Sequence, residues 1–221
     1  MKRTLTEDAL DRLLSDVSLE PENGVEMGSK DLDDLFTDLV HVVKHKDGTV
    51  QLKALEILLR ISSKVQNKVF IGSIGLRIIP FLVPVAFTTD NNLSADSSVQ
   101  NRIYGLKLLR TLAAAIEDKE SLCTSDPVLM LTVVENVGEG SVVEARVLAL
   151  HTLHHLCLSN TGINYVLEKK GFLQCLFDIA KTFQNQKEAH RVNGLIELLL
   201  LYYLFLFTIF SRFNRMGPRI K

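Results

Sequence analysis

The chain has 221 residues, of which 47% are hydrophobic and 23% are charged. This length and composition suit one sizeable core, or a stack of small units that share one, and they exclude a compositionally disordered chain. Lysine plus arginine (25) nearly balances aspartate plus glutamate (26), so no overall positive field attracts nucleic acid and we expect no nucleic-acid partner.

An amphipathic helix is predicted at the amino terminus, over Thr4 to Val17, where Thr4 and Glu7 form a capping box. The acidic stretch from Ser18 to Lys30 contains proline and two glycines without helical periodicity, so it is predicted to be a flexible connector. The helix either caps the domain that follows or detaches to dock elsewhere. Residues 1–30 are therefore the first of three predicted segments.

Helical periodicity dominates from Asp31 onward, with almost no strand alternation. A helix is predicted over Asp31 to His45 and is expected to end at Gly48, and a second helix follows over residues 49–64. A short helix, VFIGSIG, should then precede a separate helix, LRIIPFLVPVAF. The sequence thus predicts an all-α domain over residues 31–200.

A small residue followed by regularly spaced apolar residues recurs at intervals of about forty-five to fifty residues, beginning at Ala54, Gly105, Ala149 and Gly194. Short helices of this kind cannot bury their apolar faces alone, so neighbouring copies must stack. We expect each small residue to lie where a long helix crosses its neighbours closely. A large side chain there would cost about 1 to 3 kcal/mol.

The order of these motifs resembles the armadillo repeat family, in which a glycine precedes a second helix and a long third helix follows. The first half of a repeat matches at Asn67, Ile71, Gly75, Ile79, Pro80, Leu82 and Val83, and the second half matches at Val50, Gln51, Ala54, Leu55 and Leu58. The first half recurs at Asn164, Tyr165, Gly171, Phe172, Leu173 and Leu176, whereas the copy from Glu120 to Val137 is degenerate and keeps Pro127, Leu129 and Leu131. The resemblance implies an armadillo-like right-handed superhelix, an α-solenoid of about four repeats.

In the armadillo family the third helices line a concave groove that holds a partner segment. The resemblance assigns this groove to Glu56, Arg60, Lys107, Arg110, Thr111, His151 and His155, with Ile196 and Leu200 in the last copy. Nuclear-import adaptors use tryptophan and asparagine at these positions; neither is present here, so binding of import signals is not expected. The basic residues favour a mixed or acidic partner segment. The alternative is a solvated surface without a ligand.

No catalytic motif is present: the sequence has no G-x-S-x-G, no phosphate-binding glycine loop and no H-E-x-x-H. A non-enzymatic protein without a cofactor is therefore predicted. The histidines His151, His154 and His155 have the spacing of metal ligands, but Leu150, Leu153 and Leu156 should fill the core on the other side of the helix. Because no cysteine or carboxylate completes the ligand set, no metal is expected.

Three cysteines, Cys123, Cys157 and Cys175, lie in separate and mostly apolar stretches without C-x-x-C spacing. We interpret them as buried thiols in a reducing compartment. The first twenty residues are rich in acids and lack an apolar run, which argues against a secretory signal or a mitochondrial presequence. The expected location is the cytoplasm.

The carboxyl end departs from the amphipathic pattern, because residues 195–210 are apolar except for Glu197 and Thr208, and a basic tail follows. A bilayer core of about 30 Å needs about twenty apolar residues, so the run is short for a membrane anchor. A buried terminal helix or a truncated repeat is predicted, and a tail anchor or a dimerisation face is the alternative. A membrane or hydrophobic interface would comprise Leu199, Leu201, Tyr202, Phe205, Phe207 and Phe210, most of them in the third segment, 201–221.

Together these patterns predict a scaffold or adaptor whose concave face binds a segment of another protein. One alternative is a co-chaperone that resembles the armadillo nucleotide-exchange factors of heat-shock chaperones and grips a folded chaperone lobe. The other is a membrane-tethered adaptor that displays the solenoid on the cytosolic face of an organelle.

Overall fold

The structure is a computed structural model that describes residues 7–18, 29–43, 48–63, 68–87, 95–138, 141–182, 194 and 196–197. These residues form α-helices and turns, and no strand occurs among them. The helices are α1 (Glu7–Ser18), α2 (Ser29–Val43), α3 (Gly48–Ser63), α4 (Lys68–Phe87), α5 (Ala95–Ala115), α6 (Lys119–Thr124), α7 (Leu129–Val137), α8 (Val143–Leu156), α9 (Asn160–Glu168) and α10 (Phe172–Thr182).

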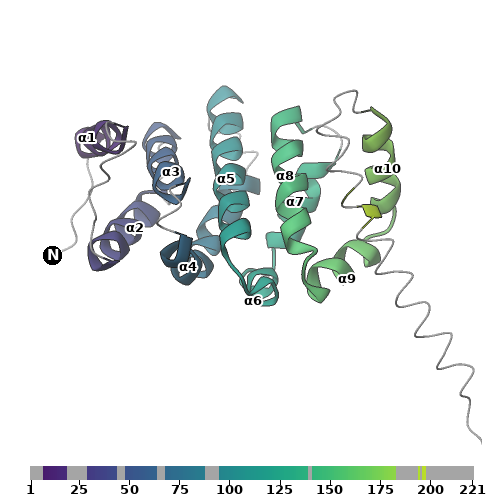
Figure 1. Cartoon of the computed structure of the whole chain (residues 1–221). Helices are drawn as coiled ribbons and strands as arrows, with labels where there is room; N and C mark the ends of the chain where they lie inside the picture. The colour runs from purple at the N-terminus through teal and green to yellow at the C-terminus, as the bar shows by residue number, and fades with distance from the viewer. Residues whose placement is uncertain are drawn as a thin grey trace, which may run out of the picture.

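The longer helices pack in two rows that follow the order of the chain (Figure 1). In the first row α5 contacts α3 on one side and α8 on the other, and in the second row α4 contacts both α2 and α7. Each first-row helix also packs on the second-row helix that precedes it in the chain, in the pairs α2 with α3, α4 with α5, and α7 with α8. Because each unit contacts chiefly its neighbours along the chain, the fold is an all-α solenoid. The predicted fold class is confirmed.

A continuous apolar core fills the space between the rows. The leucine and isoleucine positions that follow the repeated small residue are all at most 5% exposed: Leu55, Ile57 and Leu58 in α3, Leu106, Leu108 and Leu109 in α5, and Leu150 and Leu153 in α8. The same side of each long helix therefore faces the core in three successive units. Full burial of one such side chain contributes about 1.5 to 3 kcal/mol, so the shared core holds the stack together.

The repeated small residue fits its predicted role in the first three copies. Ala54 and Ala149 are fully buried, and a methyl group built on Gly105 would lie 3.4 Å from the backbone nitrogen of Ala86 in α4. Gly194 differs, because among the described residues nothing lies within 4 Å of a methyl group built on it. Contrary to the prediction, the described part of the chain therefore provides no close crossing at Gly194.

The register of the fourth copy also differs from the prediction. Ile196 is 6% exposed and belongs to the core, while Glu197 is exposed, so the assignment of Ile196 to the groove is wrong. A shift of one residue gives Ile196 the position of Leu55 and gives Glu197 the position of Glu56. The physical reason is that an all-apolar run lacks the polar residues that fix which side of a helix faces water.

Two predicted helix boundaries are also wrong. Gly48 begins α3 instead of ending the preceding helix. The two helices predicted around Gly75 form one continuous helix, α4, with Pro80 and Pro84 inside it. The two prolines lie four residues apart on the same side of α4, and because Pro84 is exposed and Pro80 is partly exposed, water can satisfy the carbonyl groups that lose a partner there.

Helix α1 extends the first row at its amino-terminal end, where it contacts α3. Leu10 of α1 is fully buried, and Asp11 lies 2.8 Å from the ammonium group of Lys53 in α3. The predicted capping residue Thr4 lies outside the described residues, as does most of the predicted connector.

The degenerate copy, Glu120 to Val137, still forms helices and contacts the last repeat. It forms α6 and α7, and the carboxylate of Glu120 in α6 accepts a hydrogen bond of 2.7 Å from the backbone N–H of Asn160 at the start of α9. In the tight turn before α9, the hydroxyl of Ser159 accepts a hydrogen bond of 2.9 Å from the backbone N–H of Gly162. Loss of the family glycine in this copy therefore leaves the helical order intact.

Candidate partner-binding face

The seven residues that the sequence assigned to the groove lie on three helices that are direct neighbours. Glu56 and Arg60 lie on α3, Lys107, Arg110 and Thr111 lie on α5, and His151 and His155 lie on α8. All seven are half-buried, whereas the leucines beside them are buried in the core. They form the outward side of the first row, which we call the α3–α5–α8 face.

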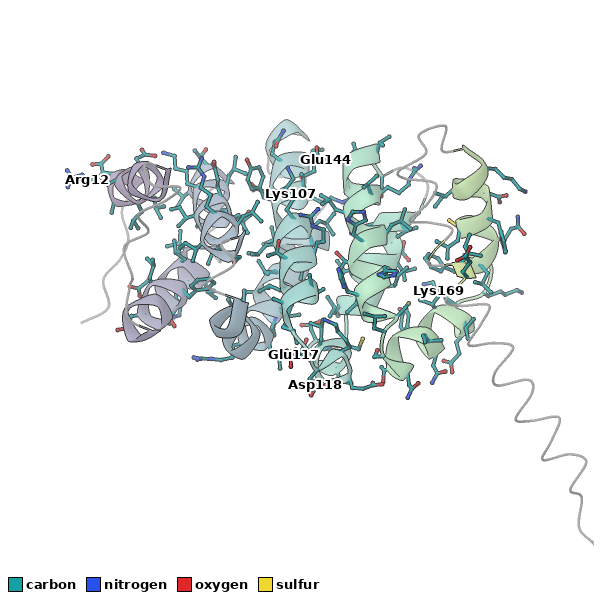
Figure 2. All side chains as sticks on the ribbon, viewed as in Figure 1. Arg12, Lys107, Glu117, Asp118, Glu144 and Lys169 are labelled. Carbon is teal, nitrogen blue, oxygen red and sulfur yellow. The ribbon has the colours of Figure 1, made fainter. Side chains whose placement is uncertain are left out.

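Part of the charge on this face is paired within the protein. The guanidinium of Arg60 lies 2.5 Å from the carboxylate of Glu56, one turn away on the same helix. The ammonium group of Lys107 lies 2.9 Å from the carboxylate of Glu144 and so links α5 to α8 (Figure 2). It also lies 5.2 Å from the centre of the Tyr104 ring, within the range of a cation–π contact.

Glu144 and Tyr104 are members of this face that the sequence reasoning missed. Tyr104 lies three residues before Lys107, one turn away on a helix, and this spacing is a signal that could have identified it. Glu144 lies in the first turn of α8, two turns before His151, the residue aligned with Lys107. The pairing therefore depends on how far α8 is offset along α5, which repeat spacing does not specify.

The hydroxyl of Thr111 is engaged locally. It donates a hydrogen bond of 2.9 Å to the backbone carbonyl of Lys107, one turn earlier in α5. The hydroxyl oxygen keeps its capacity to accept a hydrogen bond. Thr111 thus offers a ligand an acceptor and a methyl group.

The far end of the face, where α5 and α8 finish, is basic. The rings of His154 and His155 lie edge to face, with centroids 5.8 Å apart. The Lys119 ammonium group donates hydrogen bonds to the backbone carbonyls of Ala113, at 2.5 Å, and Ile116, at the end of α5. Burial, followed by the positive charge of Lys119, His154 and Arg110, lowers the pKa of His155 below its ordinary value of 6.5. His155 is therefore mostly neutral at pH 7.

The helix that carries the three histidines, α8, is apolar on its core side as predicted: Leu150, Leu153 and Leu156 are at most 5% exposed. No group of three or more histidine, cysteine, aspartate or glutamate side chains suited to a metal ion occurs in the described part of the chain.

Two of the three cysteines are buried, and the third is not. Burial raises the pKa of the Cys157 thiol to about 12 and also raises the pKa of Cys123, so neither forms the reactive thiolate readily. Cys175 is half-buried, which makes the prediction of a buried thiol wrong there. It lies on α10, the last helix of the described stack.

The predicted membrane or hydrophobic interface lies outside the described residues, as does Leu200. Among the described helices, none is long and apolar enough to cross a membrane.

No protein-family model matches the sequence, and no curated protein sequence is significantly similar to it. The fold is similar to that of a designed armadillo repeat protein, with 14% sequence identity, a TM-score of 0.45, and coverage of 87% of this chain and 92% of the designed one.

Proposed function

We propose that the chain is a non-enzymatic scaffold that binds a segment of another protein on the α3–α5–α8 face. The observation that carries the proposal is the direct contact of α3 with α5 and of α5 with α8, which makes their outward sides one uninterrupted surface. Stacked helical repeats commonly use such an extended surface to bind a partner.

The spacing of the helices suits an extended peptide. Packed helices lie about 8 to 10 Å apart, and an extended chain advances about 3.3 Å per residue. A peptide that crosses the three helices would meet a new helix about every three residues and would engage about six to nine residues in all. The described face offers such a peptide carboxylate, guanidinium, hydroxyl and imidazole groups in succession.

Preorganisation favours binding at this face. The Glu56–Arg60 and Lys107–Glu144 pairs hold four long side chains in defined positions before any partner arrives. Less side-chain entropy is then lost on association, where each immobilised long side chain otherwise costs about 0.5 to 1.5 kcal/mol.

Site-specific photo-crosslinking in cells tests the proposal. A benzophenone amino acid replaces Glu56 or Thr111 on the face, and, as matched controls, Arg77 of α4 or Glu135 of α7, both of which are exposed in the second row. We expect the same crosslinked protein from both face positions and no crosslink to it from either control. The same product from control and face positions alike, or from the controls alone, would contradict the assignment.

A further inference from the structure

Four basic side chains meet where α5 and α8 end. Arg110 lies near the end of α5, Lys119 begins α6, and His154 and His155 lie in the last turn of α8. We call this group the basic end of the α3–α5–α8 face. His154 is exposed, and the other three side chains are half-buried, so all four can be reached from solvent.

The basic end differs from the rest of the face in its lack of acidic partners. Arg60 and Lys107 each lie within 3 Å of a carboxylate oxygen. Within the described part of the chain, no salt bridge involves Arg110, Lys119 or either histidine. Arg110 is therefore available to a ligand, and Lys119 keeps one ammonium hydrogen beyond the two that it donates to the carbonyls of Ala113 and Ile116.

Two of the three acidic residues that flank Lys119 in the chain, Asp118 and Glu120, are engaged elsewhere. The carboxylate of Asp118 accepts hydrogen bonds from the backbone N–H of Ser121, at 3.0 Å, and from its hydroxyl, at 2.6 Å. The carboxylate of Glu120 accepts from the backbone at the start of α9. Glu117 is exposed, and its negative charge partly offsets the effect of burial, which lowers the pKa of Lys119.

Capping of the end of α5 accounts for the position of Lys119 but not for that of Arg110. Lys119 satisfies two carbonyl groups at the end of α5, a common role for a lysine at a helix C-terminus. Arg110 lies more than one turn before that end, outside the reach of the terminal carbonyl groups, because the effect of the helix dipole fades within the last turn. Its position near His155 is therefore not accounted for by the stability of α5.

We propose that the basic end receives a short acidic stretch of the partner, whose carboxylates pair with Arg110 and Lys119. This inference rests on the proposed function, since it assigns a chemistry to the segment that the face binds. An acidic partner segment complements the charge of the basic end. The other charges of the face are paired within the protein, whereas the cations of the basic end have no salt-bridge partner among the described residues, so a partner segment bound here should be negatively charged.

Proton uptake should accompany binding. The charged groups that act on His155 are Lys119 from α6, His154 from its own helix and Arg110 from α5, and all of them are basic. Partner carboxylates beside this ring would favour its protonated form and so raise its pKa in the complex. Because a group with a higher pKa in the complex takes up a proton on binding, the affinity should increase as the pH falls from 7.5 toward 5.5.

Fluorescence anisotropy with a labelled octaglutamate peptide tests the proposal on the full chain. An octaglutamine peptide and a peptide of alternating phosphoserine and glycine are the comparison probes. Arg110→Ala removes one cation of the basic end, and Arg12→Ala removes one exposed cation on α1, at the amino-terminal end of the stack (Figure 2). We expect octaglutamate to bind about three- to fivefold more weakly to the Arg110→Ala protein and with unchanged affinity to the Arg12→Ala protein.

The histidines give a second readout. We expect octaglutamate to bind several-fold more tightly at pH 5.5 than at pH 7.5, and this pH dependence to disappear in a His154→Gln, His155→Gln double variant. Equal losses from Arg110→Ala and Arg12→Ala would show non-specific attraction and overturn the proposal. Equal binding of octaglutamine, or binding of the phosphoserine peptide alone, would also overturn it.

The outcome separates this inference from the proposed function. If the wild-type protein gives the crosslinks from Glu56 and Thr111 but does not bind octaglutamate, the face holds a partner by other contacts and only the acidic chemistry is wrong. If the wild-type protein gives no crosslink from the face, the proposed function itself fails, together with this inference.

Discussion

The guanidinium of Arg102 in α5 donates a hydrogen bond of 2.6 Å to the side-chain carbonyl of Asn136 in α7. The amide nitrogen of Asn136 donates to the backbone carbonyls of Ala86 in α4, at 3.2 Å, and of Thr132, at 2.7 Å. Asn136 is 1% exposed, so one buried amide connects the two rows of helices. Arg102 also donates to the Ser141 hydroxyl at 2.9 Å, just before α8.

Replacement of Asn136 by alanine should lower the free energy of unfolding by about 3 kcal/mol, because it leaves the Ala86 carbonyl and the Arg102 guanidinium without this partner in a buried setting. Urea denaturation followed by circular dichroism measures the change. Asn164→Ala in α9 is the matched control, since Asn164 is exposed, and its effect should stay within about 0.5 kcal/mol. Equal effects from the two substitutions would show that the amide does not join the rows.

Gly162 of α9 and Gly105 of α5 should respond differently to the addition of a methyl group. A methyl group built on Gly162 would lie 2.2 Å from the carbonyl oxygen of Leu156, whereas at Gly105 the nearest atom is 3.4 Å away. Gly162→Ala should therefore lower the free energy of unfolding by about 3 kcal/mol. Gly105→Ala should be neutral or should stabilise α5 by up to about 1 kcal/mol. Thermal melts of both variants check this order, and the reverse order would contradict the packing described.

The three thiols should react with a thiol reagent at separate rates. At pH 8 we expect Ellman's reagent to modify Cys175 first, because Cys175 is half-buried while Cys123 and Cys157 are buried with raised pKa values. Cys123 and Cys157 should react only when the protein is unfolded in urea. A Cys175→Ser variant should lose the fast phase. A fast phase that persists in this variant would place a second thiol near solvent.

Stability should fall in mild acid through His155. Its pKa is lowered below 6.5 in the folded protein, so the unfolded chain binds a proton more readily than the folded one does. The contribution of His155 is thus fully present above pH 6.5 and is lost as the pH falls through the lowered pKa. Urea midpoints measured from pH 7.5 to 5 should fall less in a His155→Gln variant than in the wild type. Parallel curves would refute the lowered pKa, which an NMR titration of the His155 ring measures directly.

The sequence predicts the stacked helices and their core well, because both depend on local spacing. Leu55, Leu106 and Leu150 each follow a small residue by one position, and all three face the core. A 3.6-residue period alone determines which side of such a helix is apolar. The residues of the face are assigned through the resemblance to the armadillo pattern, since the period alone does not say which outward residues would meet a partner.

Other features were missed because they depend on contacts between helices, which local spacing does not specify. The sequence predicts two helices around Gly75, yet α4 is one continuous helix, which packs on α2, α5 and α7. The Lys107–Glu144 pair depends on the offset between α5 and α8. The basic end combines Arg110 of α5 with Lys119, which follows a turn, and the turn that brings them together has no repeat signature.

The affinity of the crosslinked partner for a triple variant tests the central claim most directly. Arg60, Lys107 and His155, one from each helix of the face, are replaced together by alanine, and the control triple replaces Arg77, Lys169 and Lys170, which lie on α4 and beside α9. Biolayer interferometry then gives the two dissociation constants. The account predicts binding at least about tenfold weaker for the face triple and within about twofold of wild type for the control. Unchanged binding by the face triple would contradict it.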